Sequence, residues 1–179
     1  MDPIKINSVL PNFTNLKSTD GKTYGSDSFK DDPYMLVIFS CNHCPYVKAY
    51  EDRIIDFVNE YKEKVLATLY INSNEDQNYP EDSFDEMVKR ANEKNFPFPY
   101  VRDEDQSVAK AFDATHTPEF FLFDKERRLR YNGRFDDNWR EPDKVTRKYL
   151  KEAMDSLLEG KDVAEPEVHS IGCTIKWRY

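Results

Sequence analysis

The alternation of apolar and polar positions is clearest between Tyr34 and Tyr61. Six consecutive apolar residues, Tyr34 to Phe39, indicate a strand that is buried on both faces. After the segment SCNHCP, apolar residues recur at three- and four-residue spacing up to Tyr61, which is typical of an amphipathic helix. A Cys-x-x-Cys pair therefore stands where a buried strand turns into a helix. Because the unpaired N–H groups at a helix N-terminus stabilise a thiolate, the pattern predicts a redox site.

The rest of the pattern predicts strands and helices arranged around this unit. A second buried strand over Val65 to Asn72 follows the helix closely, so we expect a βαβ unit with parallel strands. Further expected elements, in chain order, are a hairpin turning at Asp20-Gly21 between segments near 13–17 and 22–24, a helix capped by Ser83 and Glu86, a strand at 100–102, a short helix near 108–112, strands at 119–124 and 129–134, and a helix from near Asp143 to Gly160.

The last segment, 161–179, differs from the rest because it contains no helical pattern. Ile175 and Trp177 alternate with polar residues, which predicts an extended tail docked by one face. The chain of 179 residues shows no repeat and no linker, so we expect residues 1–179 to form a single domain with this tail on its surface.

Composition and charge narrow the possible partners. Hydrophobic residues make up 39% of the chain, as in a globular protein, and the formal net charge is −8. This charge argues against nucleic acid or an anionic membrane as a partner. No apolar run is long enough to span a membrane, and the first residues lack the pattern of a signal peptide, so we expect a cytoplasmic protein. Three cysteines are too few for a disulfide framework.

The order of these elements resembles the thioredoxin fold. More closely, it resembles the AhpC/TSA group, which contains TlpA/ResA-like and peroxiredoxin-like proteins. The segments that carry the resemblance are LPNFTNLKSTDGKTYGSDSFK, VIFSCNHCPY, the inserted helix between 73 and 99, and THTPEFFLFD. The resemblance implies an α/β fold in which helices flank a mixed central sheet, with an N-terminal β-hairpin and an inserted helix.

The same resemblance assigns roles to five residues. Cys41 matches the exposed nucleophile and Cys44 the shielded partner that resolves a mixed disulfide. His43 lies between them, where a protonated imidazole would favour a Cys41 thiolate. Pro118 matches a cis-proline, and Thr117 the residue whose backbone contacts a bound partner. The implied function is thiol–disulfide exchange with a protein or small-molecule disulfide or dithiol, without an organic cofactor or a metal.

Two positions depart from the patterns of related proteins, and the second argues against the alternative function. Met35 stands where thioredoxins bury a carboxylate, so the proton acceptor is not identified. Peroxiredoxins carry Pro-x-x-x-Thr/Ser-x-x-Cys, and neither cysteine fits, since counting back from Cys44 gives Cys41 and Val37. A thiol peroxidase with an antioxidant role and a peroxide as substrate remains the alternative function.

The other candidate ligands and thiols receive simpler interpretations. Zinc sites built on Cys-x-x-Cys usually have a second ligand pair, whereas here only Cys173 and the histidines could complete a set, so we predict no metal. His116 and His169 are interpreted as ordinary polar residues. For Cys173 we favour a packing role over a third thiol that reaches the site.

Overall fold

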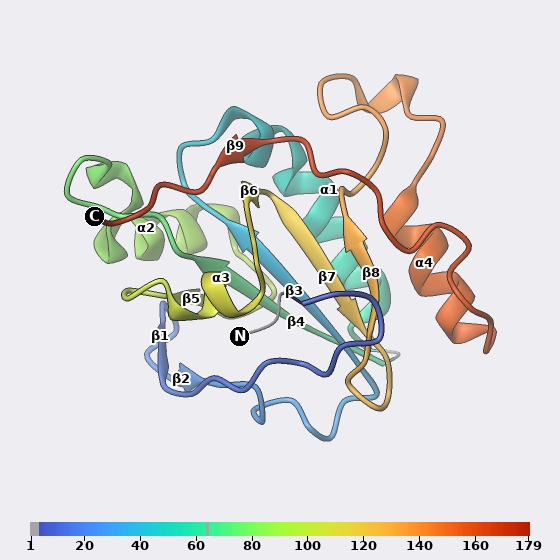
Figure 1. Ribbon diagram of the computed structural model, residues 1–179. Helices are drawn as coiled ribbons and strands as arrows, with labels where there is room; N and C mark the ends of the chain where they lie inside the picture. The colour runs from blue at the N-terminus through green and yellow to red at the C-terminus, as the bar shows by residue number, and fades with distance from the viewer. Residues whose placement is uncertain (1–3, 64) are drawn as a thin grey trace.

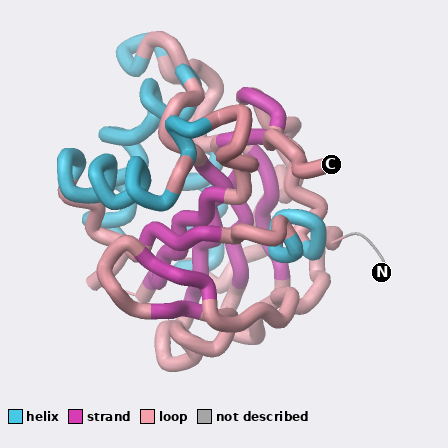
Figure 2. Tube along the Cα trace, turned by 90° about the vertical axis from the view of Figure 1, so that its left-hand side faces the viewer, coloured by secondary structure: helices cyan, strands magenta, loops and turns pink. Residues whose placement is uncertain are grey.

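The computed structural model describes residues 4–63 and 65–179, which form a mixed sheet flanked by helices (Figures 1 and 2). The main sheet has the strand order β2-β1-β5-β4-β3-β7-β8, and β6 pairs with β9 in a second small sheet. The strands are β1 (Leu16–Ser18), β2 (Thr23–Tyr24), β3 (Tyr34–Ser40), β4 (Leu66–Asn72), β5 (Tyr100–Arg102), β6 (His116–Thr117), β7 (Glu119–Phe123), β8 (Leu129–Gly133) and β9 (Cys173–Thr174). The helices are α1 (Pro45–Tyr61), α2 (Phe84–Lys94), α3 (Ser107–Ala111) and α4 (Tyr149–Leu158), with 3-10 turns η1 (Pro80–Asp82) and η2 (Pro142–Lys144).

The centre of the sheet explains the two long apolar runs. β3 pairs in parallel with β4 and antiparallel with β7, and every residue of β3 and β4 is buried. Successive side chains of a strand point to opposite faces. Leu36 and Ile38 accordingly pack on one side of the sheet, and Val37 and Phe39 on the other. A strand covered on both faces must be apolar throughout, as the sequence predicted.

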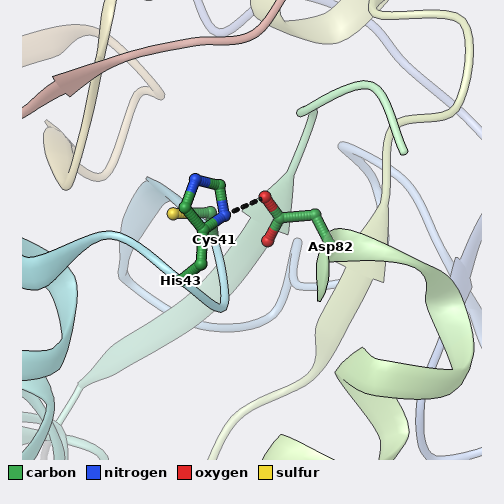
Figure 3. Close-up of side chains that lie close together, drawn as sticks. All are labelled: Cys41, His43 and Asp82. Atoms are coloured by element: carbon green, nitrogen blue, oxygen red, sulfur yellow. Dashed lines mark ion pairs between the residues drawn. The ribbon is translucent and has the colours of Figure 1, made fainter. Parts of the chain in front are cut away.

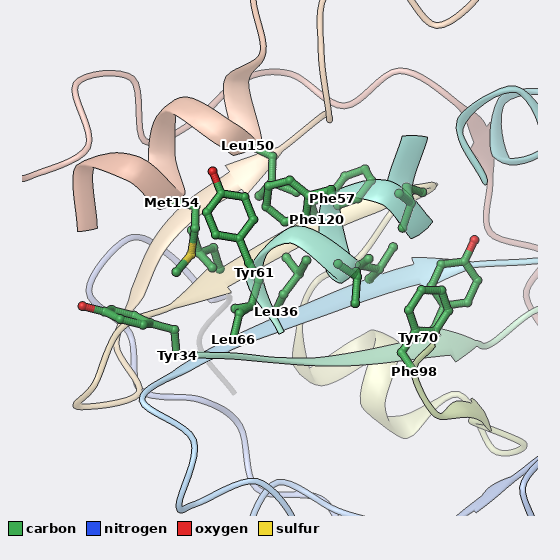
Figure 4. Packing of buried hydrophobic residues seen from close by; sticks show 14 of the residues in the cluster. Tyr34, Leu36, Phe57, Tyr61, Leu66, Tyr70, Phe98, Phe120, Leu150 and Met154 are labelled. Atoms are coloured by element: carbon green, nitrogen blue, oxygen red, sulfur yellow. The ribbon is translucent and has the colours of Figure 1, made fainter. Parts of the chain in front are cut away.

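Two hydrophobic cores lie on opposite faces of the sheet. On one face, side chains of α1, α2 and α4 pack against β3, β4 and β7, and Figure 4 shows Phe57, Tyr61, Leu150 and Met154 in this cluster. On the other face, Phe112, which follows α3, packs among residues of the sheet and of the N-terminal segment. Burying one such side chain contributes roughly 1.5–3 kcal/mol. Together these contacts hold β3 and α1, and hence the cysteines between them, in fixed positions.

Most predicted elements are present with small shifts in their ends. β1 and β2 form the predicted hairpin, although β1 begins at Leu16 rather than near Phe13. The Glu86 N–H donates a hydrogen bond to Ser83 Oγ, as expected for an N-cap. α2 ends at Asn95, which adopts a left-handed conformation.

The start of the last helix was predicted wrongly. α4 begins at Tyr149 instead of near Asp143, and only the turn η2 is found in the region where the helix was expected to begin. Val145 is extended, and the N–H of Thr146 donates to Asp137 Oδ1, while the Asp137 N–H donates to the Arg147 carbonyl. These bonds to a neighbouring loop replace the helical ones, because they satisfy the same backbone groups.

The C-terminal segment crosses the molecule close to β6 (Figure 1), and near its end Arg178 donates hydrogen bonds to Gln106 Oε1 and to the Glu104 carbonyl, just before α3. β9 pairs antiparallel with β6, and Ile175 is buried in the second core. The N–H of Glu75 donates to the Lys176 carbonyl, which ties the segment to the loop after β4. Within the described parts of the chain, no helix has the length and apolar character needed to cross a membrane.

Candidate active site

The two cysteines lie where β3 ends and α1 begins. Cys41 directly follows β3, and Cys44 is the N-cap residue of α1, with Pro45 at the first helical position. Proline is favoured there because its missing N–H would have no partner in the helix. The Cys-x-x-Cys segment is therefore positioned by a fully buried strand. The first N–H groups of α1 point toward Cys44.

Cys41 and Cys44 are both buried, so the expectation that Cys41 is exposed was wrong. Cys41 retains 2% of its accessible surface and Cys44 0%. Thr117 covers them, since its Oγ1 lies 3.5 Å from Cys41 Sγ and its carbonyl oxygen 3.4 Å from Cys44 Sγ. The half-buried Cys173 packs against the same cluster. The sequence could not show this cover, because Thr117 and Cys173 are remote from the pair along the chain.

The loop opposite the cysteines has the expected backbone. The Thr117–Pro118 peptide bond is cis, as the sequence resemblance implied. Thr117 belongs to β6, and its register partner is Cys173 of β9. Thr117 therefore contacts both the cysteines and the C-terminal segment.

A buried carboxylate lies next to the cysteines, and sequence reasoning missed it. Asp82, at the end of η1, is fully buried, and its Oδ2 lies 2.5 Å from His43 Nδ1 (Figure 3). The Cys41 sulfur, a ring nitrogen of His43 and a carboxylate oxygen of Asp82 all lie within 4.8 Å of one another. The His43 ring is also stacked on Tyr79. Asp82 thus supplies the acidic group that is missing at Met35.

The surroundings of Asp82 explain how a carboxylate can be buried here. The Asn42 N–H donates to its Oδ1 at 2.7 Å, and the side-chain amides of Asn72 and Asn74 donate at 3.3 and 3.0 Å. Such donors replace the water that a buried charge loses. Asn72 and Asn74 come at the end of β4, where polar residues of a parallel sheet often form sites. The run NSNEDQNYPED after a buried strand was the signal that could have indicated this site.

The neighbours of the two thiols shift their pKa values in opposite directions. A hydrogen bond from Cys41 lowers the pKa of Cys44 to about 5, and further ones from Cys173 and from the Val47 N–H act in the same direction. The pKa of Cys41 is raised because Cys41 donates to Cys44, is buried, and lies near the negative charge of Asp82. A Cys41 thiolate stabilised by His43 stays a prediction, and the structure places the His43 ring between the Cys41 sulfur and the carboxylate of Asp82.

The donor group Cys41, His43 and Asp82 also has the spacing of metal ligands. Both oxygens of Asp82, however, already accept hydrogen bonds from asparagine residues. The other two histidines lie elsewhere: His116 is on β6, and its ring packs against His169 with ring centroids 6.2 Å apart.

Comparisons with known proteins agree with this geometry. The redoxin family profile matches residues 5–150. A hypothetical protein of Sinorhizobium meliloti 1021 is 39% identical over 99% of this chain and 97% of its own, with a TM-score of 0.91. An uncharacterized conserved protein of Geobacillus kaustophilus is also 39% identical, over 99% of this chain and 94% of its own, with the same TM-score of 0.91.

A more distant structure shows the fold. The thioredoxin domain of a thiol-disulfide oxidoreductase from Bacteroides vulgatus is 19% identical over 70% of this chain and 86% of its own, with a TM-score of 0.59. Comparison with curated proteins finds no match. The resemblance to the AhpC/TSA group and the predicted thioredoxin-like fold are confirmed, and the chain belongs to the redoxin family.

Proposed function

We propose that this redoxin is a thiol–disulfide oxidoreductase that uses Cys41 and Cys44. The observation that carries the proposal is the buried cluster of the two cysteines at the N-terminus of α1, where Thr117 beside the cis-proline contacts both sulfurs and the pKa of Cys44 is lowered. A thiolate is the nucleophile of disulfide exchange, and a second thiol in contact with it closes the new disulfide. Dithiol chemistry of this kind needs no organic cofactor and no metal.

The reaction has two exchange steps. The Cys44 thiolate attacks one sulfur of a substrate disulfide, forms a mixed disulfide and releases the other substrate sulfur as a thiolate, which takes a proton. Cys41 then loses its proton and attacks the Cys44 sulfur, which forms the Cys41–Cys44 disulfide and releases the second substrate thiol. The substrate gains the two electrons that the protein loses, and another thiol system restores the dithiol. The same steps in reverse oxidise a dithiol.

His43 and Asp82 would serve the second step. Cys41 has a raised pKa, so its proton must be removed before it can attack. His43 lies within 4.8 Å of the Cys41 sulfur and is held by the buried Asp82. We assign His43 as the proton acceptor and Asp82 as the residue that positions the imidazole.

The cis-proline loop is the proposed contact for a partner. The backbone of Thr117 can pair with an extended segment, and Pro118 keeps this loop against the cysteines. Suitable partners are a protein or small-molecule disulfide or dithiol. Free thiols of this kind fit a reducing compartment, so we propose a cytoplasmic location.

Serine variants test the proposal. The reduced protein is mixed with a protein disulfide, and the products are separated without reductant. We expect Cys44→Ser to abolish exchange and the double variant Cys41→Ser/Cys173→Ser, in which neither neighbouring thiol can resolve the product, to accumulate a mixed disulfide through Cys44. Trapping by Cys44→Ser instead would assign the attack to Cys41. Full exchange by both variants would show that the pair is not the reactive group.

The lowered pKa of Cys44 also favours a second candidate function, a thiol peroxidase. In that reaction the Cys44 thiolate would attack a peroxide, become a sulfenic acid and condense with Cys41 to a disulfide, releasing water. The observation against this function is that Cys41 occupies the position, relative to Cys44, where peroxiredoxins carry the hydroxyl of a threonine or serine. Rates with hydrogen peroxide and with a protein disulfide, measured on the same reduced protein, distinguish the two functions.

A further inference from the structure

The C-terminal strand occupies the place where an extended partner would pair with the cis-proline loop. β9 runs antiparallel to β6, and Cys173 is the register partner of Thr117. The next residue pair is His116 with Thr174. Since Thr117 directly precedes the cis-proline, a segment of this chain is already bound where the proposed function needs an external one.

The close approach of the two backbones requires Gly172. A Cβ atom added to this glycine would lie 2.1 Å from the Thr117 carbonyl oxygen, far inside van der Waals contact. The neighbouring atom belongs to the backbone of the cis-proline loop, which cannot move aside as a flexible side chain would. A glycine before Cys173 therefore lets the strand lie directly on the loop that faces the cysteines.

The strand is also held in register beyond Cys173. The N–H of Ile175 donates to the Thr115 carbonyl at 3.0 Å, and Ile175 is itself buried. The N–H of Lys176 donates to Asn74 Oδ1 at 2.9 Å, and its carbonyl accepts from the N–H of Glu75 at 2.9 Å. These contacts place Cys173 at one defined position relative to Cys44.

At that position Cys173 touches the reactive pair. It packs against the cluster of Cys41, Cys44 and Val47, and its register partner Thr117 has its carbonyl oxygen 3.4 Å from Cys44 Sγ. It is only half-buried, whereas Cys41 and Cys44 are inaccessible. Among the three cysteines, Cys173 is thus the one that borders both Cys44 and solvent.

We propose that Cys173 is a third redox thiol, which forms a disulfide with Cys44 and carries the exchange from the buried pair to the protein surface. The inference deepens the proposed oxidoreductase function and rests on it. The sequence favoured a packing role for Cys173, because the chain alone does not show that this strand lies on the cis-proline loop.

The internal step is an exchange without net oxidation. Cys173 loses its proton and attacks the Cys44 sulfur of the Cys41–Cys44 disulfide, a Cys44–Cys173 bond forms, and the Cys41 sulfur leaves and takes up a proton. A thiol of the external partner then attacks the half-buried Cys173 sulfur and forms a mixed disulfide, and Cys44 leaves as the stabilised thiolate. The second partner thiol then attacks the first partner sulfur, and Cys173 leaves and takes up a proton, so the partner dithiol becomes a disulfide and the protein gains two electrons.

Peptide mapping tests the new bond directly. Trypsin releases 31–48, which contains Cys41 and Cys44, and 162–176, which contains Cys173. The protein is oxidised with oxidised glutathione, blocked with an alkylating agent and digested without reductant. We expect the two peptides to be joined in Cys41→Ser and to remain separate in Cys44→Ser. Absence of the joined peptides in Cys41→Ser would overturn the inference.

Kinetics test its role in exchange. Reduction of the oxidised protein by a partner dithiol should be slowed roughly tenfold or more in Cys173→Ser, because the partner must then reach a buried disulfide. Thr174→Ser, at the exposed neighbouring position, is the matched control and should react as the unchanged protein does. If Cys173→Ser and the unchanged protein are reduced at equal rates, the inference would be overturned and the proposed function would stand. If the unchanged protein shows no exchange but Cys41→Ser still forms the joined peptides, the proposed function alone would be overturned.

Discussion

At the residue scale, a few polar side chains decide which sulfur carries the charge. Cys44 receives hydrogen bonds from Cys41 and from the Val47 N–H, and its pKa falls to about 5. Cys41 lies near the carboxylate of Asp82, which contributes to its raised pKa. The two sulfurs have the same chemistry in the sequence, so their difference comes entirely from neighbours brought in by the fold.

His43→Ala is expected to slow closure of the Cys41–Cys44 disulfide by roughly tenfold or more, since the proton acceptor for Cys41 is removed. Closure of a preformed mixed disulfide is followed against pH. In the variant the rate should rise with pH throughout the neutral range, because hydroxide must replace the imidazole. His169→Ala, on an exposed residue, serves as control. An unchanged closure rate would remove His43 from the mechanism.

Asp82→Asn is expected to lower the free energy of unfolding by about 1–3 kcal/mol, the range for a disrupted buried hydrogen-bond group. Both oxygens of the carboxylate accept hydrogen bonds, from Asn42, Asn72 and Asn74. An amide has only one accepting oxygen, so it cannot accept all of these bonds. Denaturant unfolding measures the change. Asp85→Asn, on an exposed acid of α2, should differ by much less, and equal losses for both variants would contradict the explanation.

At the element scale, the site depends on three pieces of the chain that meet at one edge of the sheet. β3 and α1 hold the cysteines, η1 brings in Asp82, and β6 with β9 covers the sulfurs. The pairing of β6 with β9 is short, so the cover depends on the close approach at Gly172. Loosening this element should expose the cysteines without disturbing the main sheet.

Gly172→Ala is accordingly expected to raise the alkylation rate of Cys41 and Cys44 several-fold in the reduced protein. The added Cβ would meet the Thr117 carbonyl, and the strand must shift away from the loop. Labelling of each cysteine is measured by mass spectrometry of the digested protein. Thr174→Ala lies on the same strand but is exposed, and it should leave the rates unchanged. Equal labelling in both variants would show that the strand does not shield the sulfurs.

At the scale of the whole molecule, the thiolate links redox state, pH and stability. The pKa of Cys44 in the folded protein, about 5, is lower than its ordinary value of 9.0. Between these values the unfolded chain binds a proton that the folded protein does not bind. Stability therefore rises with pH across this range, and the contribution is lost as the pH falls through the folded-state pKa.

The reduced protein should gain stability relative to Cys44→Ser as pH rises from about 5 to about 9, by at most about 1.4 kcal/mol per pH unit. Denaturant unfolding of both proteins at a series of pH values measures the difference. Cys173→Ser is the control, because the pKa of Cys173 is raised to about 12 and should give no slope of this kind below pH 9.0. A flat difference for Cys44→Ser would mean that Cys44 is protonated at neutral pH.

The sequence by itself determined the buried parallel strands and the helix that follows Cys44, whereas the cis-proline loop was implied by the family resemblance. Local patterns suffice for these, because a strand covered on both faces must be apolar and a helix shows its period within a few turns. The family resemblance then placed the fold. The late start of α4 was not predicted, since hydrogen bonds between Asp137 and the segment at Thr146 involve a loop that no periodicity marks.

The tertiary structure decided the properties of the site. Asp82 reaches His43 from a separate turn, and Cys173 reaches Cys44 from the other end of the chain. Burial of the sulfurs, the charge on Cys44 and the shielding by β9 all arise from such distant contacts. A pKa depends on the charges, hydrogen bonds and solvent within a few ångströms of a group, and the sequence does not specify these until the chain has folded.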